Sequence, residues 1–278
     1  MVEYDELGMY AGDEVVITDN VIVTQPTLRE IKEFGEQSYF NAVQTITSVG
    51  ADMKWQLWDA GIDYTKIDDF DLFIQYTARL LASRRPIYEK IMSDKEQYAQ
   101  LLATLSKKEL EDMKKNPVGL ILKDLDFADF IPIKETYAEG VEQIVLYHPE
   151  KDFVFNKVIY LQMVEVIRRI HGFKRNNEVP ANEQTKMDLI EDARDEALAA
   201  KNKPFKSVIL PLLSTLKVES GQWGNDKIWD IKINEFFYDI KRTGHINEAK
   251  MLLQGAYSGF ASLKGVNNDK LNIFADLS

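Results

Sequence analysis

Apolar side chains recur at the three- and four-residue spacing of an amphipathic helix along most of this chain, and this periodicity limits its possible folds more than any other feature. The first such run includes Leu28, Ile31 and Phe34, and it follows Thr27 and Glu30, which are spaced as a capping box. Only two stretches have the β-branched residues and turn signals of a hairpin. Because no strand–helix–strand unit repeats, we predict a mainly α chain of the α+β type, a multi-helix globular protein with two small β-hairpin elements and a charged helical arm.

The order of these patterns divides the chain into two predicted parts. Residues 1–155 are expected to form an N-terminal α+β part, and residues 156–278 a C-terminal helical part. The arm combines eight basic and six acidic residues with few apolar positions, so we expect it to project from the body. Within the first part the predicted elements are a hairpin at 14–23, helices between 28 and 81, the charged arm at 83–116 and a second β element at 130–148.

Capping residues and helix breakers place the expected helix ends. Asp52 is a candidate N-cap for a helix at 53–60, and Gly35 is expected to kink or split the helix before it. Pro204 suits the first position of a helix that ends at Lys217, and Gly244 is expected to end another helix. The other predicted helices are 68–81, 157–171, 185–201, 228–242, 247–257 and a short one that is capped by Asn268 and carries residues 271–277.

The composition excludes several kinds of site. The chain of 278 residues has three histidines and no cysteine, so it has no disulfide, no thiolate zinc site and no cysteine nucleophile. Its net charge of −11 disfavours general binding to nucleic acid or to an anionic membrane. Residues 1–71 hold fifteen acids and four bases, so the whole excess lies there. This acidity indicates either a solvated surface or a docking face for a basic partner.

No sequence motif indicates catalysis or a cofactor. The phosphate-binding loop, the dinucleotide-binding glycine pattern, the HExxH zinc motif and the GxSxG nucleophile motif are all absent. The carboxylates at 68–71 and 124–129 are typical of helix caps and loops, and His171 stands at a helix C-terminus, where a cation meets the negative end of the dipole. We therefore predict no catalytic residue, no cofactor and no metal ligand.

Basic and apolar stretches indicate neither nucleic-acid binding nor a membrane. The basic sequence at 168–175 is interpreted as helix-end charge, with an acidic partner, such as the N-terminal quarter of another copy, as the alternative. The N-terminus is acidic where a signal peptide is basic, and no apolar stretch approaches the ~20 residues of a spanning helix. We expect a soluble cytosolic protein.

Two groups of apolar residues are candidate partner-binding anchors. Trp55 and Trp58 lie three residues apart on one predicted helix; core packing is the default for such residues, and they would anchor an interface if both were exposed. Leu271, Phe274 and Leu277 recur near helical spacing in the last predicted helix. An isolated helix this short is marginal in water, so its apolar stripe must pack on a partner, a neighbouring copy or the core of its own chain.

Six blocks of sequence carry a resemblance to a known family. They are 26–40, 52–64, 69–74 (DFDLFI), 171–174 (HGFK), 233–239 (INEFFYD) and 253–259 (LQGAYSG). Taken together, they make the chain similar to tailed-bacteriophage proteins that are encoded among the tail genes of phages of Gram-positive-type hosts, near the tape-measure gene. Such proteins resemble tail-assembly chaperones or minor tail components. Residues 83–116 depart from the pattern, because a shorter connection is expected there.

This resemblance implies a non-enzymatic role as a chaperone or assembly factor for tail or tape-measure components. The alternative is a structural virion component of the baseplate, neck or tail tip, and an enzyme whose site is assembled from distant residues is a third reading. The implied partners are tape-measure, tube or baseplate proteins and a second copy of the chain, with no nucleic acid and no membrane. The implied location is the host cytoplasm or the virion. A tail chaperone needs grooves for amphipathic helices and a soluble exterior.

Overall fold

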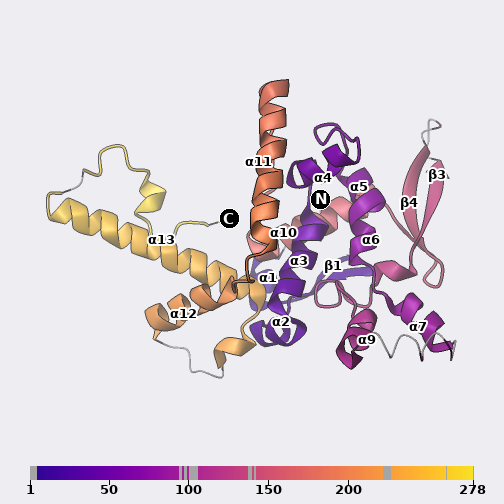
Figure 1. The fold of residues 1–278 in the computed structure, drawn as a ribbon. Helices are drawn as coiled ribbons and strands as arrows, with labels where there is room; N and C mark the ends of the chain where they lie inside the picture. Colours follow the sequence, from indigo (N-terminus) through magenta and orange to yellow (C-terminus); the bar gives the residue numbers. More distant parts are fainter. Residues whose placement is uncertain are drawn as a thin grey trace.

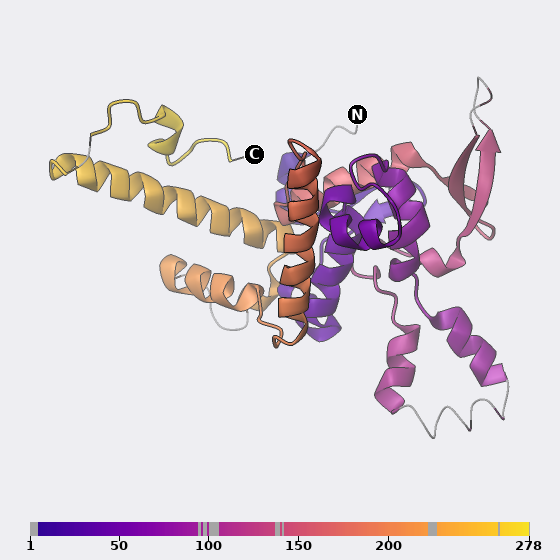
Figure 2. The same cartoon turned by 45° about the horizontal axis from the view of Figure 1, so that its top comes forward.

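The computed structural model describes residues 5–93, 96, 99, 106–136, 140, 142–221, 227–260 and 262–277. The predicted fold class is confirmed: the described chain is mainly helical and contains two small antiparallel sheets, one of two strands and one of three (Figure 1). Two groups of helices project from different sides of the body, the α12–α13 pair to the left and the α7–α9 pair downward in Figure 2.

The first half of the chain contains short elements. They are α1 (Glu6–Ala11), β1 (Val15–Thr18), β2 (Val21–Val23), α2 (Leu28–Phe34), α3 (Glu36–Thr47), a 3-10 turn (Gly50–Met53), α4 (Lys54–Asp59), α5 (Asp69–Leu72), a π turn (Phe73–Thr77), α6 (Ala78–Leu81), α7 (Arg85–Ser93), α9 (Lys107–Lys114) and a 3-10 turn (Phe127–Asp129).

Longer helices follow the second sheet. The elements are β3 (Ile131–Thr136), β4 (Glu142–His148), β5 (Phe153–Phe155), α10 (Lys157–His171), α11 (Glu183–Lys201), α12 (Ile209–Ser220), a 3-10 turn (Lys227–Asp230), α13 (Ile233–Tyr257) and a 3-10 turn (Asn268–Lys270). The strand β5 was not predicted, because three residues are too few to show an alternating pattern; it pairs with β4, with Phe155 opposite Leu146.

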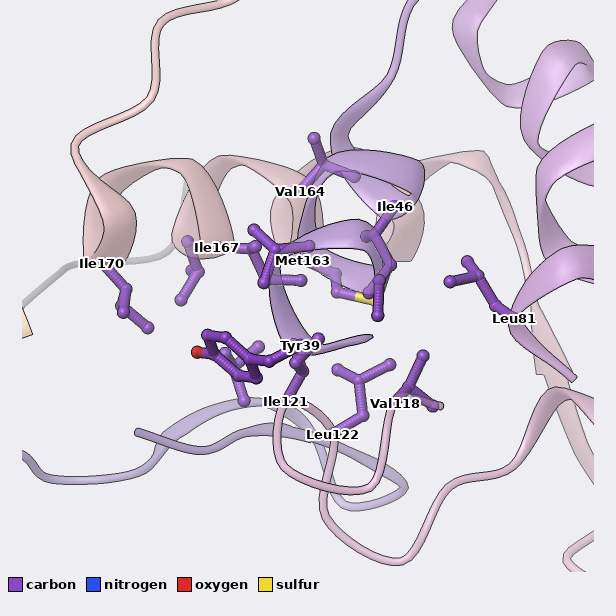
Figure 3. Packing of buried hydrophobic residues seen from close by; sticks show 14 of the residues in the cluster. Tyr39, Ile46, Leu81, Val118, Ile121, Leu122, Met163, Val164, Ile167 and Ile170 are labelled. Carbon is purple, nitrogen blue, oxygen red and sulfur yellow. The ribbon is translucent and has the colours of Figure 1, made fainter. Parts of the chain in front are cut away.

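Helix α10 lies at the centre of the main core. It packs against α3, α5, α13 and the β1–β2 hairpin. In Figure 3 its side chains Met163, Ile167 and Ile170 converge with Tyr39 from α3 and with Ile121 from the turn at 117–121. Burial of each large apolar side chain contributes about 1.5–3 kcal/mol to folding. Residues from both sides of the predicted boundary after residue 155 share this core cluster.

Local capping signals account for several helix ends that the sequence predicts correctly. The Asn156 side chain accepts hydrogen bonds from two N–H groups in the first turn of α10, and Gly172 ends that helix in the left-handed region with φ of 65°. Thr27 and Glu30 form the predicted capping box of α2. Gly35, with φ of 103°, splits α2 from α3 as expected.

The predicted helix start at Pro204 is wrong. Residues 204–207 are irregular, and α12 begins at Ile209. The Glu36 carboxylate of α3 accepts hydrogen bonds from the backbone N–H groups of Val208 and Ile209, at 2.6 and 2.9 Å, and from the Ser207 hydroxyl at 2.7 Å. A cap supplied by a distant helix therefore sets the start of α12, and such a cap leaves no signal in the neighbouring sequence.

The predicted stop at Gly244 is also wrong. Helix α13 runs unbroken from Ile233 to Tyr257, and Gly244 is one of its interior residues. A glycine inside a helix costs only about 1 kcal/mol relative to alanine, which a helix of 25 residues can tolerate. The expected pair of helices at 228–242 and 247–257 is thus one helix, preceded by a 3-10 turn.

Two smaller boundary predictions differ from the structure. Asp52 does not cap α4: its carboxylate accepts the N–H of Val49 at 3.0 Å and closes the 3-10 turn that precedes the helix. Helix α11 begins at Glu183, two residues before the predicted start, because Asn182 caps it by accepting the N–H of Thr185.

The last predicted helix, which carries residues 271–277, does not form. The 3-10 turn Asn268–Lys270 is capped by Asn267 rather than by Asn268, and the chain then runs back along α13 in both views (Figures 1 and 2). Arg242 Nη1 of α13 donates hydrogen bonds to the carbonyls of Ile273 and Ala275, at 2.9 and 2.8 Å. These bonds to α13 hold the segment in a non-helical course, and a helix of seven residues is too short to be stable by itself.

The described residues of the predicted charged arm at 83–116 include the two helices α7 and α9, and most of the residues between them, 94–105, lie outside the described ranges. The two helices pack against each other and project from the body (Figure 2), and the Ser106–Glu109 capping box starts α9. An ion pair between Arg85 and Asp129 joins the base of the arm to the turn before the second sheet.

Candidate functional site

The two predicted tryptophan anchors occupy different environments. Trp55 is half-buried against the second apolar cluster, which includes Leu57 and Ile190. Trp58 is 39% exposed, and the ammonium of Lys186 lies 5.9 Å from the centre of its ring. Helix α11 covers this side of α4, so Trp55 and Trp58 do not form a joint exposed surface.

The three predicted C-terminal anchors also separate. Phe274 is 84% exposed, whereas Leu271 and Leu277 are half-buried. Leu277 lines a pocket at the base of α13, so this residue packs on its own chain, and Phe274 is the one of the three that faces solvent.

The basic sequence at 168–175 contacts the acidic N-terminal quarter of the same chain. Arg168 Nη2 donates to the Thr47 carbonyl at 2.6 Å, and Arg175 forms a two-pronged ion pair with Asp69 at 3.0–3.1 Å. Six N-terminal carboxylates pair in this way with bases from later in the chain: Glu6 with Arg169, Glu14 with Lys123, Asp59 with Arg194, Asp63 with Lys186, Asp68 with Lys157, and Asp69 with Arg175. The acidity of residues 1–71 is therefore partly neutralised inside the molecule.

The carboxylate groups at 68–71 and 124–129 have structural partners. Asp68 caps α5 and pairs with Lys157 at 2.7 Å. Asp126 caps the 3-10 turn that follows it and also accepts the N–H of Ser83 at 3.0 Å. Within the ranges that the structure describes, no group of three or more histidine or carboxylate side chains is placed to hold a metal ion.

A pocket of about 410 Å³ lies where α1, the end of α10, the start of α13 and the C-terminal segment meet, and we call it the α1–α13 pocket. This volume is within the range of small-molecule binding sites. Its apolar walls are formed by Leu7, Met9, Ile170, Phe237 and Leu277. Helix α13 presents Asn234, Phe237, Tyr238 and Lys241 to it, at the i, i+3, i+4 and i+7 positions that share one face of a helix.

Two tyrosines stiffen one side of this pocket. The Tyr10 hydroxyl donates a 2.9 Å hydrogen bond to Asp239 Oδ1, and the rings of Tyr10 and Tyr238 meet edge to face with centroids 5.3 Å apart. Burial, and the adjacent Asp239 carboxylate, raise the pKa of Tyr10 far above its usual range. Burial also raises the pKa of Asp239. The Tyr10 hydroxyl therefore stays protonated, and its proton is already donated to Asp239.

His171 lies between two pocket-lining residues, but its ring is buried in the core. Nδ1 is 2.7 Å from the Ile167 carbonyl, which can only accept, so Nδ1 carries the proton. Nε2 then accepts a hydrogen bond from the Tyr39 hydroxyl, also at 2.7 Å. Burial lowers the pKa of His171 to about 4, so the ring is neutral at pH 7. The expectation of a cation at this helix end is wrong.

The α12–α13 projection, residues 209–220 and 233–260, is the second notable surface. Tyr257 and Phe260, at its tip, are 89% and 92% exposed. Other large apolar side chains are exposed along α12, α13 and the adjoining C-terminal segment: Leu210, Val218, Tyr238, Met251, Ile273 and Phe274. This part of the molecule thus carries a set of apolar groups that its own chain leaves uncovered.

The pocket was not predicted from the sequence, although the residues that α13 contributes to it show helical spacing in the sequence. The predicted helix at 228–242 already contains Asn234, Phe237, Tyr238 and Lys241 at helical spacing. Nothing in the sequence indicates that this face meets Tyr10 of α1, which lies more than 220 residues earlier. Contacts of that separation are decided by tertiary packing.

Comparisons with known proteins add no relative. The chain matches no protein-family model, and neither a curated protein nor a solved structure shows significant similarity to it. No helix in the described part of the chain combines the length and the apolar character needed to cross a membrane.

Proposed function

We propose that this protein is a non-enzymatic assembly factor for bacteriophage tails, which acts as a chaperone by binding apolar helical segments of a tail protein through the α12–α13 projection. The observation that carries the proposal is the exposed apolar tip of that projection, with Tyr257 and Phe260 in solvent. Large apolar side chains that stay exposed on a projecting element are typical of protein-contact surfaces. The sequence resemblance supplies the partner class, the tape-measure protein first and the tube or baseplate proteins next.

The rest of the molecule suits such a role physically. A chaperone for apolar helices must stay soluble while it binds them, and a net charge of −11 favours solubility. Binding of an amphipathic helix requires apolar side chains at helical spacing on an accessible element. The projection has exposed apolar residues on both of its helices, Leu210 and Val218 on α12 and Met251 and Tyr257 on α13.

Co-expression with the tape-measure protein that the proposal assigns as the partner tests it. We expect the chain to raise the soluble fraction of the tape-measure protein and to elute with it in size-exclusion chromatography. A double variant, Tyr257→Ser with Phe260→Ser, should lose this effect, because the exposed rings contribute to binding and little to folding. Val179→Ser is the matched control, since Val179 is 83% exposed in the loop before α11, outside the projection.

Equal solubility of the tape-measure protein with and without the chain would contradict the proposal. Mass spectrometry of purified phage particles separates the chaperone from the alternative role. A chaperone should be absent from particles or present only in trace amounts, whereas a fixed copy number per particle would favour a structural component of the baseplate, neck or tail tip.

A further inference from the structure

We infer that the α1–α13 pocket binds a small apolar carboxylate, a molecule with an apolar chain and a single carboxylate group. The inference concerns a surface separate from the tip of the α12–α13 projection, and it does not depend on the proposed function. It rests on the shape and lining of the pocket and on which of its polar groups already have partners.

The apolar residues that line the pocket favour a ligand with an apolar chain. Leu7 and Met9 of α1 stand on one side, and Phe237 of α13, Ile170 of α10 and Leu277 of the C-terminal segment complete the lining. A ligand that fills this space exchanges water for apolar contacts, which is the main source of affinity in sites of this kind.

The charged residues that line the pocket favour a ligand with an anionic group. Four charged side chains line the pocket, and Glu6 and Arg169 pair with each other at 3.7 Å. Asp276 is engaged in an interaction within the chain. Lys241, in contrast, forms neither a hydrogen bond nor an ion pair with any residue that the structure describes. An unpaired ammonium beside an apolar surface favours a carboxylate.

The position of Lys241 orients the ligand along α13. Asn234 and Lys241 are seven residues apart on one face of the helix, which corresponds to about 10.5 Å along its axis. The rings of Phe237 and Tyr238 lie between them on the same face. A carboxylate at Lys241 therefore places an apolar chain across these rings, toward the Asn234 amide, and a chain of about ten carbons suits this span.

Isothermal titration calorimetry of the full chain with decanoate, below the concentration at which it forms micelles, tests the inference. We expect saturable binding of one decanoate per chain, weaker binding of 1-decanol, and no measurable binding of decyltrimethylammonium. Lys241→Gln should weaken decanoate binding roughly threefold to tenfold and leave 1-decanol unchanged, because only the carboxylate contact is lost. Leu7→Gln should weaken both, since Leu7 is 77% exposed and its loss affects the wall without affecting folding.

Lys250→Gln is the matched control, since Lys250 is exposed on the same helix and does not line the pocket. Thermal unfolding of each variant verifies that the chain is folded. The inference is overturned if decanoate shows no saturable binding, or if Lys241→Gln and Lys250→Gln change its affinity equally. It is also overturned if decanoate binding survives Leu7→Gln but is lost in the Tyr257→Ser, Phe260→Ser variant, because the ligand would then lie at the tip of the projection.

Discussion

The Tyr39 hydroxyl donates a 2.7 Å hydrogen bond to Nε2 of His171, and this bond joins α3 to the end of α10 inside the core. The Ile167 carbonyl accepts a hydrogen bond from Nδ1–H, so both nitrogens of a neutral imidazole are satisfied. A proton on Nε2 would face the Tyr39 hydroxyl, whose own proton already points toward Nε2. Both side chains are buried, so no water can take over either hydrogen bond. The core is therefore built for the neutral form of this histidine.

We expect the free energy of unfolding to decrease as the pH is lowered from about 6.5 to about 4. Burial lowers the pKa of His171 to about 4 in the folded chain, whereas an unfolded histidine titrates near 6.5. As the pH falls, the unfolded chain binds the extra proton first, so the contribution is intact above pH 6.5 and about 3 kcal/mol is lost by pH 4. Urea unfolding at a series of pH values measures this loss.

Two variants isolate the contribution of His171 from that of the carboxylates. His171→Gln should be less stable at pH 7 and should show a shallower pH dependence between 6.5 and 4 than the parent chain. His245→Gln measures, at pH 7, the cost of removing a histidine that lies outside the core and contacts the Asn272 carbonyl through Nε2 at 2.8 Å. Identical slopes for the parent and for His171→Gln would show that the buried ring is not held neutral.

Glu36→Ala is expected to lower the stability of the chain by about 1 kcal/mol and to fray the start of α12. The Glu36 carboxylate caps that helix from α3, and loss of a capping acceptor costs about 0.5–2 kcal/mol. Glu33→Ala is the matched control, because Glu33 is an exposed residue of the neighbouring α2. Denaturant unfolding gives the stabilities, and hydrogen exchange at Val208 and Ile209 reports the fraying. Equal losses of stability in Glu36→Ala and Glu33→Ala would mean that the Glu36 cap does not stabilise α12.

Gly244→Ala is expected to raise stability by about 0.5–1 kcal/mol. Gly244 lies in the interior of α13, and an added Cβ would meet no atom within 4 Å apart from its chain neighbours and the backbone of its own helix. Gly172→Ala should do the opposite, because Gly172 ends α10 with φ of 65°, where a Cβ is strained. Thermal unfolding of both variants is the measurement. A destabilised Gly244→Ala chain would indicate that α13 is broken at this residue.

Truncation after Asn267 is expected to lower the stability of the monomer by roughly 1–2 kcal/mol, because the C-terminal segment is docked on its own chain. Arg242 donates to two carbonyls of the segment, and Leu277 lines the α1–α13 pocket. Arg242→Ala should reproduce part of the loss, and Lys250→Ala should not. Thermal unfolding combined with size-exclusion chromatography separates the two readings of the segment. A truncated monomer of full stability that no longer assembles would favour partner binding.

The sequence was sufficient wherever the deciding contact lies within about four residues. The Asn156 cap, the Gly172 stop and the capping boxes at Thr27 and Ser106 all form between near neighbours in the chain, and the structure contains each of them. The mainly helical class followed for the same reason, because helical periodicity is a local property of the apolar residues.

Tertiary structure alone decided the rest. The start of α12 depends on Glu36, more than 170 residues away, and the α1–α13 pocket depends on the meeting of Tyr10 with Asp239 and Tyr238. Whether Trp55, Phe274 or Leu277 is exposed likewise depends on what packs over it. Burial, distant caps and the charge state of His171 are set by groups that meet only in the folded chain, so no local pattern encodes them.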